Sequence, residues 1–381
     1  SEIVRPTRDG IHSREYISTT VMLGRRSRAL EFDKADRLAS VLPPQLELPI
    51  PVLFDPLPVP LPGEGATLAM IRAASQLGTL ALVRASEWTE ALAKLTAADA
   101  AAVAPILDPD DDPTLACVRT AHLVEIQVEE SGNLRAARHL SDRLREVNPS
   151  AVIAFRLPFG PDCADLVENL AASGAGAIHL HADEAGYEPV GYAGNGSGGT
   201  KPHFVADVLQ EVHHRLVAVN QRDQVTLIVS GGIAAAEHVP KAMVCGADAV
   251  AVDLVLQVAL GCALWADVRF PCPVEDQEID PDWGAQRIVN LMAAWRDQLL
   301  EVLGAMGMRE VSRLRGELGR AIFQPKEEQE FHSLFARIVP DHPAAVPPGP
   351  GDGELEGDLR WPTALILATA EQARTGQPPT S

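Results

Sequence analysis

The sequence predicts an α/β protein of the (β/α)8 TIM-barrel class, in which parallel strands close into a cylinder surrounded by helices. The first observation is a series of short apolar runs rich in β-branched residues, typical of strands buried on both faces. The second is that the segments between these runs carry apolar residues at helical spacing and end at polar or small residues. The third is their number, because eight such units fit a closed barrel better than an open doubly wound sheet.

The elements follow one another in a regular order. The eight predicted strands are residues 48–55, 79–85, 101–108, 122–128, 151–158, 177–183, 225–230 and 249–253. The clearest helical segments between them are 131–148 and 162–173. Alanine is frequent between 79 and 108, which weakens the strand signal of two of the runs.

The segments that flank the barrel predict four regions. Residues 1–47 are expected to form an N-terminal arm that wraps the barrel, and the barrel itself spans 48–267. Residues 268–339 are a helical cap, in which 282–307 is strongly amphipathic. Residues 340–381 are a Pro-, Gly- and acid-rich linker (340–358) followed by a terminal helix (364–373).

Composition excludes several classes of partner. The net charge of −20 disfavours nucleic acid and anionic membrane surfaces. No apolar stretch is long enough to span a membrane, and the first residues have no signal-peptide layout. Five cysteines without tight pairing indicate a reducing compartment. We therefore expect a soluble, cytoplasmic protein.

Active sites of such barrels lie at the C-terminal ends of the strands, called the mouth. The polar residues expected there are Asp55, Glu129, Glu130, Arg156, His181, Asp183, Glu184, Ser230 and Asp253. This set is acidic with one arginine. His179 and His181 share a strand face, and His181 with Asp183 could bind a metal; hydrogen-bonded histidines that fill the barrel are the favoured interpretation, so no metal is assigned. The Gly-rich loop 187–204 could close over a ligand or a neighbouring protein.

Several ordered motifs carry a resemblance to a known family. They are SGGT (197–200), LVAVNQRDQVTLIVSGGI (216–233), CGADAVAVDLVLQVALGC (245–262) and LLEVLGAMGMREVSRLRG (299–316). Over about residues 18 to 323 the chain resembles the FMN-binding barrel domain of glutamate synthases. That resemblance implies a barrel that holds FMN and a three-iron cluster and reduces 2-iminoglutarate, formed from 2-oxoglutarate and ammonia, to glutamate. The positions that match its cofactor site are Arg156, Gly198, Gly199, Thr200, Ser230, Gly231 and Gly232.

The chain also departs from that family at its cofactor motifs. Asp253 and Leu254 stand where the family has Gly-Thr beside the FMN phosphate, and a carboxylate there would repel it; capping of the next helix is the alternative role of Asp253. PLPVPLPG (56–63) replaces the loop that offers N–H groups to the flavin, and proline has none. Cys262 and Cys272 match two of the three cluster ligands, so an iron–sulfur cluster is not expected.

Two hypotheses follow. The favoured one is a glutamate-synthase-like pseudoenzyme without cofactor, with eroded flavin and iron–sulfur sites, that serves as a subunit or scaffold of a larger complex with other protein subunits. The alternative is an FMN-dependent oxidoreductase of glutamate synthase type that reduces an imine such as 2-iminoglutarate. The sequence assigns no catalytic residue, and a homo-oligomer stays open.

Overall fold

The computed structural model describes most of the barrel and its flanking elements. The described residues are 17–27, 29–40, 42–90, 92–128, 133–160, 162–189, 203–262 and 277–317. The predicted linker and terminal helix at 340–381, and residues 268–276 and 318–339 of the predicted cap, lie outside them.

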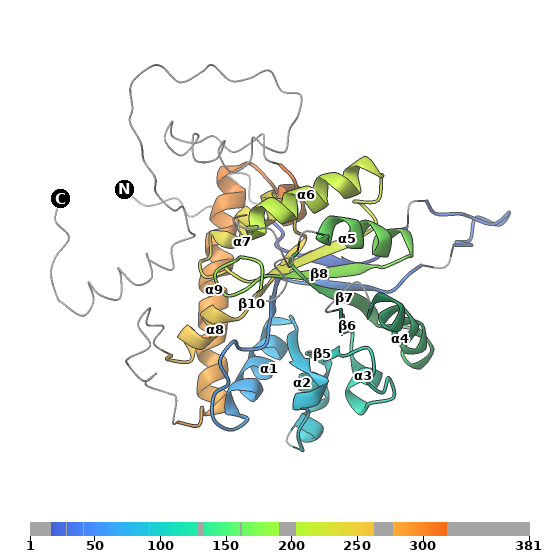
Figure 1. The fold of residues 1–381 in the computed structure, drawn as a ribbon. Coiled ribbons are helices and arrows are strands. Elements are labelled where there is room, and N and C mark those ends of the chain that lie inside the picture. Colours follow the sequence, from blue (N-terminus) through green and yellow to red (C-terminus); the bar gives the residue numbers. More distant parts are fainter. Residues whose placement is uncertain are drawn as a thin grey trace, which may run out of the picture.

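Eight parallel strands close into a barrel in the order β10-β3-β4-β5-β6-β7-β8-β9, so the predicted fold class is confirmed (Figure 1). The strands are β3 (Val52–Phe54), β4 (Ala81–Arg84), β5 (Val103–Leu107), β6 (Leu123–Gln127), β7 (Val152–Pro158), β8 (Ala177–His181), β9 (Thr226–Ser230) and β10 (Ala249–Val252). The barrel closes where β10 pairs with β3. Each predicted run contains one of these strands, including the two alanine-rich runs, because burial on both faces outweighs the low strand propensity of alanine.

The helices surround the barrel. Their bounds are α1 (Gly65–Leu77), α2 (Ala97–Ala101), α3 (Ala116–Thr120), α4 (Leu134–Val147), α5 (Cys163–Ala172), α6 (Val205–Ala218), α7 (His238–Val244), α8 (Leu254–Ala259) and α9 (Pro281–Ala305), with 3-10 turns η1 (Ala85–Glu87), η2 (Leu92–Lys94) and η4 (Val311–Leu314). Helix α4 shows why these segments are helical, since Ala137, Leu140, Ser141 and Leu144 are its buried residues and recur at helical spacing.

Helix α9 confirms the amphipathic segment predicted after the barrel. Asp280 accepts a hydrogen bond from the Trp283 N–H at its start, and Pro281 occupies the first turn, where a missing N–H costs nothing. The helix packs along α1 and α8 on the outside of the barrel (Figure 1). None of the described helices has the length and apolar character needed to cross a membrane.

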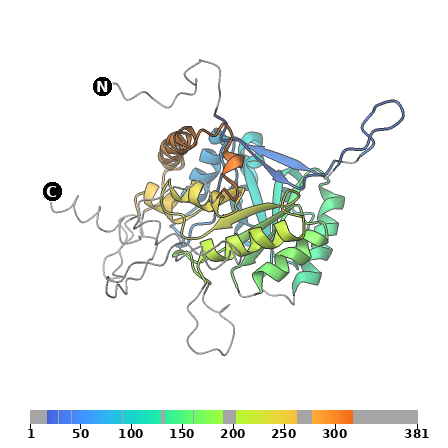
Figure 2. The same ribbon diagram turned by 90° about the horizontal axis from the view of Figure 1, so that it is seen from above.

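The segment before the barrel forms an antiparallel pair, β1 (Val21–Gly24) with β2 (Gln45–Leu48). Thr226 at the start of β9 accepts a hydrogen bond from the Gly24 N–H and donates one to the Gly24 carbonyl. This pair therefore sits against the N-terminal ends of the barrel strands, at the opposite end from the mouth. Between β1 and β2 the chain projects from the body, as Figure 2 shows.

Candidate functional site

The centre of the barrel holds a buried ion pair between Arg156 and Asp55. Arg156 points inward from β7, and Asp55 directly follows β3. Both terminal nitrogens of Arg156 donate to the two carboxylate oxygens of Asp55 at 2.7 Å, and both side chains are only 6% exposed. Such a bidentate pair fixes the plane of the guanidinium. The cofactor-site candidate Arg156 is therefore engaged by a carboxylate of its own chain.

Two further side chains extend this pair into a network. Glu125 of β6 lies 3.2 Å from Nη1 of Arg156, and its other oxygen lies 2.9 Å from Nδ1 of His179 in β8. Nε2 of His179 is 3.0 Å from the hydroxyl of Ser230 at the end of β9. Nη1 of Arg156 also lies 3.1 Å from Nδ1 of His179, so the four side chains Arg156, Glu125, His179 and Ser230 form one connected polar cluster.

Electrostatics keep Asp55 ionised and Arg156 charged. Burial acts to raise the pKa of Asp55, but Arg156, His179 and a hydrogen bond from Ser230 outweigh it and lower the pKa to about 2. Burial likewise acts to lower the pKa of Arg156, and the carboxylates of Asp55 and Glu125 raise it instead. Asp55 and Arg156 are thus both charged over the physiological range.

Glu125, His179 and Ser230 have the order of an acid–base–nucleophile triad, but their surroundings do not suit that chemistry. Ser230 is 1% exposed, and Glu125 and His179 are fully buried. The Ser230 hydroxyl bonds to Asp55 as well as to His179, so its proton has a carboxylate partner. A nucleophile needs an accessible oxygen and a free base, so this arrangement is suited to filling the barrel rather than to attacking a substrate.

A second polar pair lies nearer the mouth. Nε2 of Gln127 is 3.4 Å from Nε2 of His181, and burial, with Arg156 and His179, lowers the pKa of His181 to about 3. The expected metal partner Asp183 instead accepts hydrogen bonds from the N–H groups of Ala185 and Tyr187 in its own loop. Within the described ranges, no three His, Cys, Asp or Glu side chains gather as a metal site.

The predicted glycine turn after β9 is present and is packed against its own chain. Gly231 and Gly232 have φ values of 92° and 70°, which glycine adopts most readily. A Cβ on Gly231 would lie 2.5 Å from the Asp183 carbonyl oxygen, and one on Gly232 would lie 2.9 Å from Cα of Gly186. Both glycines thus allow the loop after β8 to approach closely.

His238 makes a side-chain hydrogen bond to the backbone just after these two glycines. The N–H of Ala234 donates to Nδ1 of His238, the first residue of α7, at 3.1 Å. Burial, followed by Lys241, lowers the pKa of His238 to about 4, so the ring is neutral near pH 7 and can accept this bond. One main-chain donor of the turn is therefore used internally.

Asp253 caps the helix that follows β10. Its carboxylate accepts a hydrogen bond from the N–H of Leu254, the first residue of α8, at 2.6 Å. Burial, together with the negative charges of Asp55 and Glu184, raises the pKa of Asp253 to about 6. The capping role expected as the alternative is observed, and the carboxyl also stands in an acidic part of the mouth.

Several predicted site residues have no structural description. Gly198, Gly199 and Thr200, the mouth residues Glu129 and Glu130, and Cys272 lie outside the described residues. Cys262 is half-buried at the end of the segment after α8. Cys163 and Cys245 are buried, and burial raises the pKa of each thiol to about 12.

Sequence reasoning missed the pairing of Arg156 with Asp55 and the part played by Glu125. A usable signal was present, because Glu125 and Arg156 are charged residues inside two mostly apolar runs. A charge inside a buried strand requires a partner, and opposite charges on neighbouring strands of a barrel can supply one.

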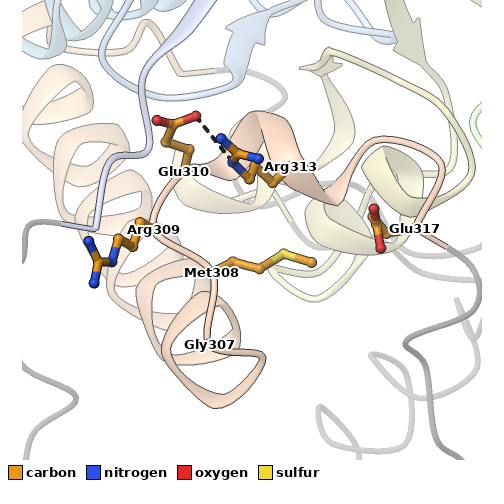
Figure 3. Close-up of a pocket in the computed structure, with 6 residues that line it drawn as sticks. All are labelled: Gly307, Met308, Arg309, Glu310, Arg313 and Glu317. Carbon is orange, nitrogen blue, oxygen red and sulfur yellow. Dashed lines mark ion pairs between the residues drawn. The ribbon is translucent and has the colours of Figure 1, made fainter.

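A separate hollow lies outside the barrel, beside η4 (Figure 3). It has a volume of about 470 Å³. Its lining residues are Gly307, Met308, Arg309, Glu310, Arg313 and Glu317. Glu310 and Arg313 form an ion pair at 3.6 Å across its rim. Because η4 packs on α7 and Val311 bonds to Ser18, this hollow is remote from the mouth.

Known proteins resemble the chain in sequence. Residues 133–309 match the family model described as the conserved region in glutamate synthase. The archaeal-type glutamate synthase [NADPH] of Thermotoga maritima is 24% identical over 374 residues, which covers 83% of this chain and 71% of the relative. The archaeal glutamate synthase [NADPH] of Methanocaldococcus jannaschii is 32% identical over 161 residues, covering 38% of this chain and 31% of the relative.

A solved structure, mandelate oxidase with benzoyl-formic acid, superposes with a TM-score of 0.48 at 16% identity, over 78% of this chain and 85% of that chain. The family match and the long alignment with the Thermotoga protein cover most of the motifs quoted from the sequence. Together these similarities support membership of the glutamate-synthase-like family.

Proposed function

We propose that this chain is a glutamate-synthase-like barrel whose flavin and iron–sulfur sites have eroded, and that it serves as a cytoplasmic subunit or scaffold of a larger complex. One observation carries the proposal. Both terminal nitrogens of Arg156, the basic side chain that the family resemblance assigns to the cofactor site, are bound by Asp55 at 2.7 Å inside the barrel. Freeing Arg156 for a ligand would leave Asp55 buried and unpaired, at a cost of about 3–5 kcal/mol.

The phosphate position supports the same conclusion. The glycine turn of Gly231 and Gly232 is closed onto the loop after β8 by main-chain contact. Asp253 adds a carboxylate at the end of β10, where the family has Gly-Thr. Two unit charges about 4 Å apart near a surface repel by roughly 4 kcal/mol, and Asp253 is mostly ionised above pH 6, because its pKa is about 6. The described residues therefore do not fit the phosphate of FMN.

The cysteines support the loss of the cluster. The family uses three cysteines, of which this sequence matches Cys262 and Cys272. The buried thiols of Cys163 and Cys245, with pKa values raised to about 12, are poor substitutes because a ligand must be a thiolate. Cys163 begins α5 at the mouth end of the barrel, whereas Cys245 follows α7 at the opposite end, so the two thiols stand far apart along the barrel axis.

A visible absorption spectrum of the full chain, purified with its natural partners, tests the proposal. We expect no flavin bands, no quenching of FMN fluorescence when FMN is added, and other protein subunits in the preparation. A yellow protein with one FMN per chain would overturn the loss of the flavin site. A chain that purifies alone, and that captures no subunit after mild crosslinking in cells, would overturn the scaffold role.

The second candidate function is an FMN-dependent oxidoreductase that reduces an imine such as 2-iminoglutarate. Its support is the relationship to proteins named glutamate synthase [NADPH] and the retained turn of Gly231 and Gly232 with positive φ. It requires Arg156 to leave Asp55 when the cofactor binds. Variant Asp55→Asn weakens that competition, so under this hypothesis it binds FMN more tightly than the natural chain, whereas loss of the site predicts no uptake by either.

A further inference from the structure

The segment between β1 and β2 is a hairpin that leaves the body of the protein, as far as its described residues 25–27, 29–40 and 42–44 show. From here on, the arm means residues 25–44 alone, a part of the predicted N-terminal region 1–47. Phe32 and Leu38 pair in an antiparallel bridge. At the tip, Asp33 accepts hydrogen bonds from the N–H groups of Ala35 and Arg37 and forms an ion pair with the Arg37 side chain at 2.9 Å. Figures 1 and 2 show the arm, in blue, pointing away from the helices in both views.

The arm presents large apolar side chains to solvent. The exposed fractions are 54% for Leu30, 59% for Phe32, 43% for Leu38 and 54% for Leu42. A two-stranded hairpin has no core of its own and is at best marginally stable in water. Phe32 lies directly across from Leu38, and a hairpin with four exposed large apolar side chains is expected to be covered by another surface, because such groups mark contact sites.

The root of the arm is fixed to the barrel. Arg25 donates to the carbonyls of Ala171 and Ala175. Gly176 has room for no side chain, since its Cβ would lie 2.9 Å from the backbone nitrogen of Arg25. The arm therefore projects from the N-terminal end of the barrel strands in a defined direction, which lowers the entropy cost of docking it on a partner.

The charge of the arm, compared with that of the whole chain, indicates which surface the arm contacts. The arm contains five basic residues and three acidic ones, whereas the whole chain has a net charge of −20. The body of a second copy is thus a strongly acidic surface that complements a basic, apolar arm. An exchange of arms between two copies is also self-complementary, as a twofold interface requires.

We propose that the arm is a dimerisation element that packs its apolar side chains on the acidic body of a second copy of this chain. Each copy would give one arm and receive one, so the contact closes and does not propagate. The interface would lie at the N-terminal end of the barrel and leave the mouth free. This inference does not rest on the loss of the flavin site and holds for either candidate function.

Sedimentation of the full chain over a concentration series, at low and high salt, tests the proposal. We expect a dimer that salt weakens. The double variant Phe32→Ser/Leu38→Ser should raise its dissociation constant about 100-fold or more, because two central apolar contacts are lost. Val258→Ser, at an exposed position of α8 at the mouth end, is the matched control and should leave the dimer intact. A monomeric natural chain, or a dimer indifferent to the double variant, overturns the proposal.

A second measurement remains informative even where the double variant folds poorly. A photoreactive amino acid in place of the exposed Ala35 at the tip of the arm is activated in a mixture of isotopically heavy and light copies. Heavy–light crosslinked peptides that join the tip to acidic segments of the body are expected. Crosslinks found only within single copies would contradict an exchange of arms.

Discussion

The carboxyl of Asp253 is the most direct point at which to test the electrostatics of the mouth. It is partly buried, caps Leu254 and lies near the negative charges of Asp55 and Glu184, and its pKa is raised from 3.8 to about 6. Replacing it with asparagine keeps a side-chain oxygen for the cap and removes the charge. Since asparagine is as good a cap as aspartate, the substitution isolates the electrostatic cost.

The sign and size of the effect follow from the two pKa values. A carboxyl whose pKa is higher in the folded state contributes stability that is fully present below the unfolded pKa and is lost as the pH rises through about 6. Each pKa unit corresponds to about 1.4 kcal/mol, so the ionised carboxyl of Asp253 lowers the free energy of unfolding by at most about 3 kcal/mol near neutral pH.

Urea unfolding of Asp253→Asn at about pH 7.5 and about pH 4 measures this. We expect the variant to be about 2–3 kcal/mol more stable than the natural chain at the higher pH and nearly equal to it at the lower one. The control is Asp280→Asn, because Asp280 caps α9 in the same way at an exposed site; a change within about 0.5 kcal/mol is expected there. A destabilised Asp253→Asn, or a gain that does not depend on pH, would refute the reasoning.

Three further outcomes are expected from the barrel interior. Arg156→Met should lower the free energy of unfolding by about 3–5 kcal/mol, because it leaves buried carboxylates unpaired. Arg156→Lys keeps the charge and should lower it by only about 1–2 kcal/mol. Equal losses in the two variants would show that the charge is unimportant. The coupling energy between Arg156→Met and Asp55→Asn in a double-mutant cycle should shrink by about 2 kcal/mol from about pH 5 to about pH 2. The pKa of Asp55 is about 2 in the folded protein, so its stabilisation is present above the pKa of the unfolded chain and is lost as the pH falls through 2. A coupling energy that stays constant counts against the pair. Gly231→Ala should lower the free energy of unfolding by about 3 kcal/mol or more in thermal or urea unfolding, because its Cβ would meet the Asp183 carbonyl. The control Gly174→Ala has a similar φ of 97° and open space around the Cβ, so it should cost only about 1–2 kcal/mol. Similar losses in both would mean that backbone strain alone matters.

The fold could be predicted from local pattern because each strand of such a barrel is buried on both faces. Runs such as 225–230 and 249–253 are mostly apolar, and the turn residues Gly231 and Gly232 follow the first of them. The ends were less predictable. The run at 48–55 contains only a three-residue strand, Val52–Phe54, because Leu48 belongs to the pair outside the barrel. Local composition does not distinguish a strand that joins the barrel from one that covers its end.

The site could be predicted only in part, because its decisive contacts are long-range. The turn at Gly231 and the cap at Asp253 are local features, and their residue types indicate them. The pairing of Arg156 with Asp55 joins residues 101 positions apart in the chain. It depends on closure of the barrel, which brings the ends of β3 and β7 to face each other across the interior. A comparison of motifs treats each position separately, so it predicted that Arg156 was available to bind a ligand.

The interior network is better explained by the proposed loss of a ligand than by a gain in stability. Buried ion pairs are often no more stabilising than apolar side chains of similar size, so stability alone gives no reason for Arg156, Asp55 and Glu125 to occupy the centre of an aliphatic barrel. In a barrel that binds an anionic or electron-rich ligand, a basic side chain at this point of β7 would meet the ligand. Once the ligand is gone, that side chain requires a counter-charge of its own, and Asp55 supplies one with both oxygens. Pairing then raises the cost of readmitting a ligand, because the same guanidinium cannot serve both partners.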